Sequence, residues 1–195
     1  MPRQPDPDLQ ERILNAAQKL WKKGAEKTLT MRAVAKAAGT NTPAVYRRFR
    51  NREDILRALL RRIQQDVSDA MRLGGSPEEV CERYLGYALA HPHEYELFYT
   101  HAYRLPAPGR SGRTVPLREQ RSAMALVEEK LAERLGGSPA EHTRLSLALW
   151  TVSHGTAMIL ISRAIPETHA AELRSAFTAA VKTLIHSSSS LSTQK

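Results

Sequence analysis

The chain has 195 residues, of which 42% are hydrophobic, and this composition excludes a wholly disordered protein and allows a sizeable buried core. The formal net charge is +9. All of this excess lies in residues 1–62, which contain 15 Lys and Arg residues against 6 Asp and Glu residues. A basic segment joined to a neutral one predicts that only the N-terminal part of the protein meets a polyanion.

The single cysteine, Cys81, cannot form an internal disulfide and has no partner at a metal-ligand spacing. The first residues are polar and include prolines, which is not the pattern of a secretory signal. We therefore expect a cytoplasmic protein with no metal site and no cofactor.

Apolar residues recur at spacings of three and four along the chain, which predicts an all-α fold of about nine helices. The first helix is expected to start at Asp8 and to end near Gly24. A second, short helix should follow Thr30, whose hydroxyl can cap the free amides of its first turn, and should end at Gly39.

The third predicted helix begins at Asn41 or Thr42, because both are good N-cap residues and Pro43 suits a first turn. Val45 and Phe49 lie one turn apart and are expected to face the core. A short helix, a turn at glycine and a second short helix form the pattern of a helix-turn-helix. In such a motif the second helix enters the major groove of DNA.

The outer face of this third helix combines small side chains with cations. The side chains expected on its outer and leading edges are those of Thr42, Pro43, Ala44, Tyr46, Arg47 and Arg48. Small side chains permit close approach to base edges. The Arg47 side chain is long enough to reach and hydrogen bond to a guanine or a phosphate. Contacts with DNA phosphates are expected from Tyr46, Arg48 and Arg52. The alternative is that these arginines form an ordinary solvent-exposed helix face and do not bind DNA.

Residues 9–62 resemble the DNA-binding domain of the tetracycline-repressor (TetR) family of bacterial regulators. The resemblance is carried by the string TMRAVAKAAGTNTPAVYRRFRNRE at residues 30–53. It implies that Arg32 reaches a base from the second helix. The predicted DNA-binding set is Thr30, Arg32, Asn41, Thr42, Pro43, Ala44, Tyr46, Arg47, Arg48 and Arg52.

A fourth helix is predicted from the N-cap Asn51 to about Met71. Residues 74–79 and 136–141 are similar to each other, and each ends one helix and caps the next with serine and glutamate. A Pro/Gly loop is expected at residues 104–116. The remaining helices are predicted near residues 77–90, 93–103, 117–135, 139–163 and 168–186.

These elements predict an N-terminal three-helix helix-turn-helix domain followed by a helical domain for ligand binding and dimerisation. The boundaries are a flexible N-terminus at 1–8, the DNA-binding domain at 9–56, the second domain at 57–186 and a disordered tail at 187–195. The apolar stretch at residues 145–161 is interrupted by polar side chains. We therefore interpret it as a buried helix rather than a membrane span.

Aromatic and soft apolar side chains concentrate in the central helices, where they can line a pocket for a mostly apolar effector. The predicted ligand-binding set is Tyr87, Phe98, Tyr99, Met124, Trp150, His154 and Met158. The alternative is that these side chains belong to an ordinary core. His154 in particular is more typical of a hydrogen-bonded core or interface histidine than of a metal ligand.

Two parts of the chain together look like one C-terminal subgroup of the TetR family. They are His91-Pro92 followed by EYELF at residues 94–98, and Trp150 followed by His154 and Gly155. This resemblance implies that the last two helices pair with their copies in a partner to form a four-helix bundle. The residues with the spacing of a bundle seam are Leu173, Phe177, Val181 and Leu184. The predicted partners are a second copy of the chain, double-stranded DNA and a small effector.

We expect a ligand-responsive transcriptional regulator, a repressor that binds a palindromic operator as a dimer. One alternative is a constitutive DNA-binding protein without an effector. Another is a small helical enzyme, but the sequence contains no G-x-S-x-G elbow, no Walker loop and no H-E-x-x-H motif, so no catalytic residue is predicted.

Overall fold

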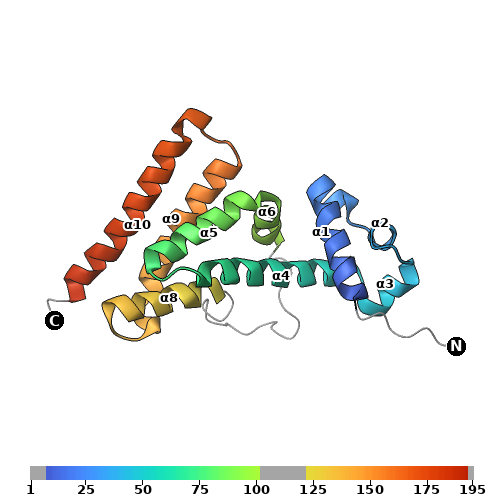
Figure 1. Ribbon diagram of the computed structural model, residues 1–195, viewed down its shortest axis with the longest axis horizontal. Helices are drawn as coiled ribbons and strands as arrows, with labels where there is room; N and C mark the ends of the chain where they lie inside the picture. The colour runs from blue at the N-terminus through green and yellow to red at the C-terminus, as the bar shows by residue number, and fades with distance from the viewer. Residues whose placement is uncertain (1–7, 102–121, 193–195) are drawn as a thin grey trace. The chain divides into compact units, whose positions relative to one another are not determined.

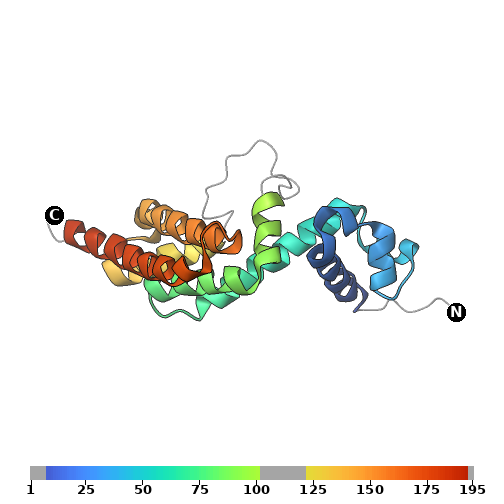
Figure 2. The same ribbon diagram turned by 90° about the horizontal axis from the view of Figure 1, so that it is seen from above.

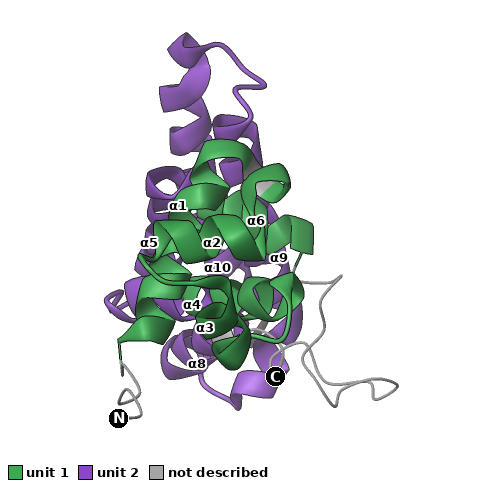
Figure 3. Ribbon diagram, turned by 90° about the vertical axis from the view of Figure 1, so that its right-hand side faces the viewer, with its two compact units in different colours: residues 1–63, 93–111 green, residues 64–92, 112–195 purple. Residues whose placement is uncertain are grey.

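The computed structural model describes residues 8–101 and 122–192. Within these ranges the chain consists of α-helices and short 3-10 segments, without a strand (Figure 1). The predicted all-α fold class is confirmed. The described residues divide into two compact units, one of residues 8–63 and 93–101 and the other of residues 64–92 and 122–192 (Figure 3).

The first unit contains α1 (Leu9–Thr28), α2 (Met31–Ala37), α3 (Thr42–Arg48), the first half of α4 (Arg52–Arg72), and α6 (Pro92–His101). Helix α2 contacts both α1 and α3. Apolar side chains at helical spacing turn inward from each of these helices. The fully buried ones include Ile13, Ala17, Val34, Val45, Ile55 and Leu59.

Helix α1 is one turn longer than predicted, because Gly24 lies inside it and does not end it. A Cβ atom on Gly24 would lie 2.4 Å from the Thr28 methyl group, so the missing side chain makes room for Thr28. The Thr28 hydroxyl in turn donates a hydrogen bond to the Leu20 carbonyl, at 2.6 Å. The glycine therefore serves close packing and not a helix end.

Helix α6 belongs to the first unit, whereas the predicted boundary placed it in the second domain. Its buried Glu94 accepts hydrogen bonds from Lys22 Nζ at 2.6 Å and from Gln18 Nε2 at 3.0 Å, both on α1. The Trp21 ring meets the His101 ring edge to face, with centroids 5.3 Å apart. These contacts link segments that are about 75 residues apart in the sequence.

The second unit contains the rest of α4, α5 (Pro77–Ala90), α8 (Ser122–Leu135), α9 (Thr143–Ile161) and α10 (Ala170–Ser192). Two 3-10 segments, Pro139–His142 and Glu167–His169, precede α9 and α10. Helix α9 contacts α5, α8 and α10, and it lies beside α10 in both views (Figure 2). It is thus the central helix of this unit.

Both predicted serine caps are present. The Ser76 hydroxyl accepts a hydrogen bond from the Glu79 amide at 3.2 Å, at the start of α5. At the second cap, the Glu141 carboxylate accepts hydrogen bonds from the amide and the hydroxyl of Ser138, at 3.1 and 2.7 Å. Local side-chain chemistry therefore sets both helix starts.

The helix predicted to be buried, α9, is buried on one face only. Its inner face includes Ser146, Leu149 and Ser153. The segment Pro139–Ile161 is long and apolar enough to cross a membrane by length and composition, and 28% of its most apolar window is buried within the chain. The outer face of α9 consists mainly of half-buried apolar side chains.

Helix α10 differs from its prediction at its C-terminal end. It continues to Ser192, so residues 187–192 are helical instead of a disordered tail. The Ser188 hydroxyl donates to the Leu184 carbonyl one turn back, at 3.0 Å, which lets serine stay within a helix. Phe177 and Val181 are buried within the protomer. A four-helix bundle also buries side chains between the two helices that one protomer contributes, so the predicted four-residue seam stays a prediction.

Some predictions fall outside the described residues. These are the flexible start before residue 8, the loop at 104–116, the first turn of the helix predicted from 117, and residues 193–195.

Candidate nucleic-acid interface and ligand cavity

The turn between α2 and α3 is fixed by one glycine and one asparagine. Gly39 has a φ of 65°, a left-handed conformation that glycine adopts without steric cost. The Thr40 amide then donates back to the Ala35 carbonyl at 3.0 Å. The Asn41 carboxamide oxygen accepts a hydrogen bond from the Ala44 amide at 2.9 Å. Asn41 is therefore the N-cap, and α3 begins at Thr42.

Helix α3 has an apolar inner face and a cationic outer face. Val45 and Phe49 are buried, as their spacing predicts. Tyr46 is 53% exposed, and Pro43, Arg47 and Arg48 are exposed as well. This face offers an aromatic hydroxyl and guanidinium groups to solvent within little more than one helical turn.

One prediction for this face is wrong. The side chain of Ala44, expected on the outer edge, is only 4% exposed. Ala44 lies one residue before the buried Val45, and the inner face of α3 is wide enough to include both. Its methyl group packs inward and is not available to a base edge.

The predicted residues outside α3 occupy different positions. The Thr30 hydroxyl caps α2 by accepting a hydrogen bond from the Ala33 amide at 3.1 Å, as expected. Arg32 is exposed on α2, and Thr42 is half-buried at the start of α3. The guanidinium of Arg52 donates to the Glu26 carboxylate and, at 3.4 Å, to the Glu26 carbonyl. Arg52 is thus already engaged with an anion of its own chain.

Several ion pairs within the first unit join carboxylates to cations on α1 and α4. The carboxylates of Glu11, Glu26 and Glu94 are held by Arg62, Arg52 and Lys22. The carboxylates of Glu53 and Asp54 are both held by Arg57. None of these cations belongs to α3. These five carboxylates therefore neutralise cations on α1 and α4.

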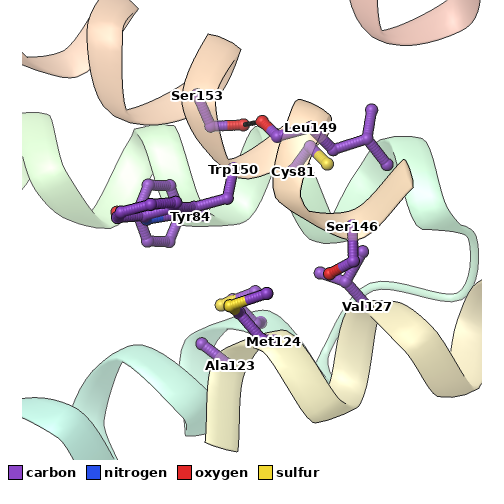
Figure 4. A pocket seen from close by; sticks show the side chains of 10 residues that line it. Cys81, Tyr84, Ala123, Met124, Val127, Ser146, Leu149, Trp150 and Ser153 are labelled. Atoms are coloured by element: carbon purple, nitrogen blue, oxygen red, sulfur yellow. Dashed lines mark hydrogen bonds between the residues drawn. The ribbon is translucent and has the colours of Figure 1, made fainter. Parts of the chain in front are cut away.

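The second unit contains a cavity among α4, α5, α8 and α9 (Figure 4). Its empty space measures about 310 Å³, which includes space open to solvent. The part of this space that a water molecule can reach measures about 20 Å³, which is room for about one water molecule. The lining residues are Met71, Cys81, Tyr84, Ala123, Met124, Val127, Ser146, Leu149, Trp150 and Ser153.

The structure brings only Met124 and Trp150 of the predicted ligand-binding set into this cavity. His154 stacks on Trp150 with ring centroids 5.6 Å apart, and Met158 lies half-buried further along α9. Tyr87 lines a shallower groove on the surface of α4 and α5. Phe98 and Tyr99 lie on α6 in the first unit, with ring centroids 5.4 Å apart.

The sequence analysis missed most of the cavity. Among the missed residues are the two serines of α9, Ser146 and Ser153. They share a helical face with Leu149 and Trp150, since these two residues lie three and four positions after Ser146 and four and three positions before Ser153. Small polar residues repeated on one face of an otherwise apolar helix are the signal that could have identified them.

The thiol of Cys81 is a neutral group in this cavity. Burial desolvates the thiolate and raises the pKa of Cys81 from 9.0 to about 12, although a hydrogen bond with Ser153 lowers it. A thiol with this pKa is protonated at neutral pH and is a poor nucleophile and metal ligand. Among the described residues, no group of His, Cys, Asp and Glu side chains is arranged to hold a metal ion.

A capped turn that presents a short cationic helix defines a helix-turn-helix DNA-binding protein. Residues 13–59 match the family model of bacterial regulatory proteins of the tetR family, and residues 78–184 match that of the tetracyclin repressor-like C-terminal domain. Together the two models cover most of the chain. It belongs to the TetR family and is a DNA-binding transcriptional regulator.

Solved structures share the fold. A protein of unknown function from Rhodococcus sp. RHA1 is 22% identical, with a TM-score of 0.72, 96% of this chain covered and 98% of that one. The regulatory protein SCO4313 is 21% identical, with a TM-score of 0.70 and coverages of 91% and 95%. A TetR-like transcriptional regulator, also from Rhodococcus sp. RHA1, is 18% identical, with a TM-score of 0.58 and coverages of 96%. No curated protein sequence matches the chain. The C-terminal subgroup suggested by Trp150, His154 and Gly155 stays a prediction.

Proposed function

We propose that this protein is a cytoplasmic, ligand-responsive repressor that binds a palindromic operator as a homodimer, with α3 of each protomer in the major groove. The observation that carries the proposal is the exposed cationic face of α3 on a turn held by Gly39 and Asn41. A rigid, capped helix of seven residues presents its side chains to a groove at little entropic cost.

The side chains of this face divide into two roles. Thr42 and Arg47 read base edges, because Thr42 lies at the leading end of α3 and Arg47 is exposed one turn later. Tyr46 and Arg48 hold phosphates, and Arg32 approaches from α2. Arg52 contributes less than the sequence predicts, because Glu26 competes with phosphate for its guanidinium.

The outer face of α9 supports the proposed dimer. Ala148, Val152, Gly155 and Ile159 are half-buried within the protomer and lie at spacings of four, three and four. This is the repeat of a helix-bundle seam, and small residues at two of its positions allow close approach of a second helix. Regulators of this family typically dimerise, and two recognition helices double the contacts with a palindromic site.

The proposed ligand response is supported by α4, because this helix belongs to both units. Residues 52–63 of this helix belong to the DNA-binding unit, whereas residues 64–72 belong to the unit with the cavity. Met71 lines the cavity. A ligand that binds one position of α4 more tightly than another shifts the protein toward that position. It changes operator affinity by at most the ratio of its two affinities.

The experiment that tests this function is selection of bound fragments from genomic DNA, followed by competition with random DNA at one salt concentration. A regulator prefers its palindrome by roughly 10³-fold or more. Similar affinity for selected and random DNA favours a constitutive DNA-binding protein and contradicts the proposal. Turnover of a bound compound by the purified protein favours an enzyme.

A further inference from the structure

Three lysines form a stripe along the C-terminal half of α1. Lys19, Lys23 and Lys27 follow one another at spacings of four, so they lie on one face of the helix. All three side chains are exposed. The distance along the helix from the first to the last is about 12 Å, at roughly 1.5 Å per residue. We call this set the lysine stripe.

The acidic side chains near the lysine stripe are bonded to other cations. Glu26 of α1 is held by Arg52, and Glu94 of α6 is held by Lys22. Within the part of the chain that the structure describes, no carboxylate pairs with a lysine of the stripe. Like charges four residues apart on a helix repel each other and destabilise it. A negative partner from outside the protein would offset this repulsion.

The lysine stripe begins beside the helix-turn-helix. Lys27 lies in the last turn of α1, next to Glu26, whose carboxylate holds Arg52 at the start of α4. Thr30, three residues after Lys27, is the N-cap of α2, and α4 begins four residues after the end of α3. The last turn of α1 therefore lies close to elements that carry DNA-binding side chains, and the stripe leads away from them along α1.

The polyanion that this protein binds is DNA. Duplex DNA has one phosphate charge per about 1.7 Å of its axis, so several phosphates fall within the length of the lysine stripe. Lysine ammonium groups on flexible side chains hold phosphates without reading bases. We propose that the lysine stripe binds the phosphate backbone of the DNA beyond the base pairs that α3 reads. This inference rests on the proposed function and adds a second contact surface for the same DNA.

The test is titration of the full chain with the selected operator at several salt concentrations. The operator fragment includes about one helical turn of flanking base pairs on each side. In the glutamine variant, Lys19, Lys23 and Lys27 are all replaced by Gln. We expect the slope of log K against log salt to fall by about two to three units and the affinity at physiological salt to fall roughly 10- to 100-fold. Preference for the operator over random DNA should not change, because phosphate contacts carry no sequence information.

Two further variants separate phosphate binding from a change of net charge. Replacing the same three lysines by arginine keeps the cations and should keep the wild-type slope. The matched control carries Arg83→Gln, Arg144→Gln and Arg174→Gln, which remove the same charge from exposed positions of the second unit. Its slope should also stay at the wild-type value.

Ethylation of single phosphates locates the contact on the DNA. Wild-type binding should be blocked by ethylation at a set of phosphates outside the base pairs that α3 protects, and the glutamine variant should tolerate ethylation at that set. The glutamine variant should fold normally, with an unchanged or higher melting temperature, because it lacks the repulsion between lysines.

The inference is overturned if the glutamine variant keeps the wild-type slope and ethylation pattern, or if the matched control loses as much slope. It is also overturned if the glutamine variant loses binding to vesicles of anionic phospholipid but not to DNA, which would assign the stripe to a membrane surface. Loss of operator preference in the wild type overturns the proposed function. Failure of the slope difference alone leaves recognition by α3 intact.

Discussion

Glu94 shows how a single buried carboxylate connects the DNA-binding unit. Burial desolvates its charge and by itself raises the pKa of Glu94. The hydrogen bonds from Lys22 and Gln18 outweigh this effect, so the pKa lies below its ordinary value of 4.5. A carboxylate with a lowered pKa stabilises the folded state above its unfolded pKa, and this stabilisation is lost as pH falls through the folded value.

We expect Glu94→Gln to lower the free energy of unfolding by about 1–3 kcal/mol at pH 7, because Lys22 loses its partner. We also expect the variant to lose less stability than the wild type when pH is lowered below about 4.5. Thermal unfolding of both proteins across a pH series measures these effects. Glu96→Gln, an exposed change on the same helix, is the control. Parallel pH curves for wild type and Glu94→Gln would contradict this role.

The roles of the α3 cations can be separated by their dependence on salt. Arg48→Ala should weaken binding to every DNA sequence and reduce the slope of log K against log salt by about one unit. Arg47→Ala should instead change which base is preferred within the site. Titrations of specific and random DNA at several salt concentrations measure both effects. Equal losses for the two variants on both DNAs would show that the assigned roles are wrong.

At the scale of elements, the helix-turn-helix could be predicted from sequence, and α1, α6 and α10 could not be fully predicted. The caps at Thr30 and Asn41 and the turn at Gly39 depend on residues three or four positions apart, so local patterns contain them. The packing of Thr28 over Gly24 and the contact of Glu94 with α1 depend on three-dimensional neighbours. Periodicity cannot reveal such contacts.

The same limit explains the predictions for the side chains of the site. Ala44 follows a small-residue pattern that suits a base contact, but its burial depends on the other helices of the unit. Phe177 and Val181 have bundle spacing, which is the same whether the partner helix belongs to this chain or to a second one. Sequence spacing identifies an apolar face without identifying what covers it.

The turn between α2 and α3 should tolerate asparagine better than alanine at position 39. No atom lies within 4 Å of a Cβ placed there, so the left-handed backbone alone sets the cost. Gly39→Ala should therefore destabilise the protein by about 1–2 kcal/mol. Gly39→Asn should cost less, because asparagine adopts this conformation more readily. Urea unfolding of the two variants provides the comparison, and equal stability would contradict the backbone explanation.

At the scale of the whole molecule, dimerisation should depend on the outer face of α9. Ile159→Arg places a charge on the proposed seam and should convert the dimer to a monomer at micromolar concentrations. Light scattering after size-exclusion chromatography measures the mass. Glu129→Arg, a change at an exposed position of α8, is the control. A variant Ile159→Arg that remains dimeric would place the interface elsewhere.

The most direct measurement of DNA recognition is protection of guanine N7 from methylation on a selected operator. Guanine N7 lies in the major groove, where α3 is expected to bind. We predict two symmetry-related sets of protected guanines, both lost in a variant carrying Thr42→Ala and Arg47→Ala. Unprotected guanine N7 together with protection of adenine N3, which lies in the minor groove, or uniform protection along the fragment, would contradict recognition by α3.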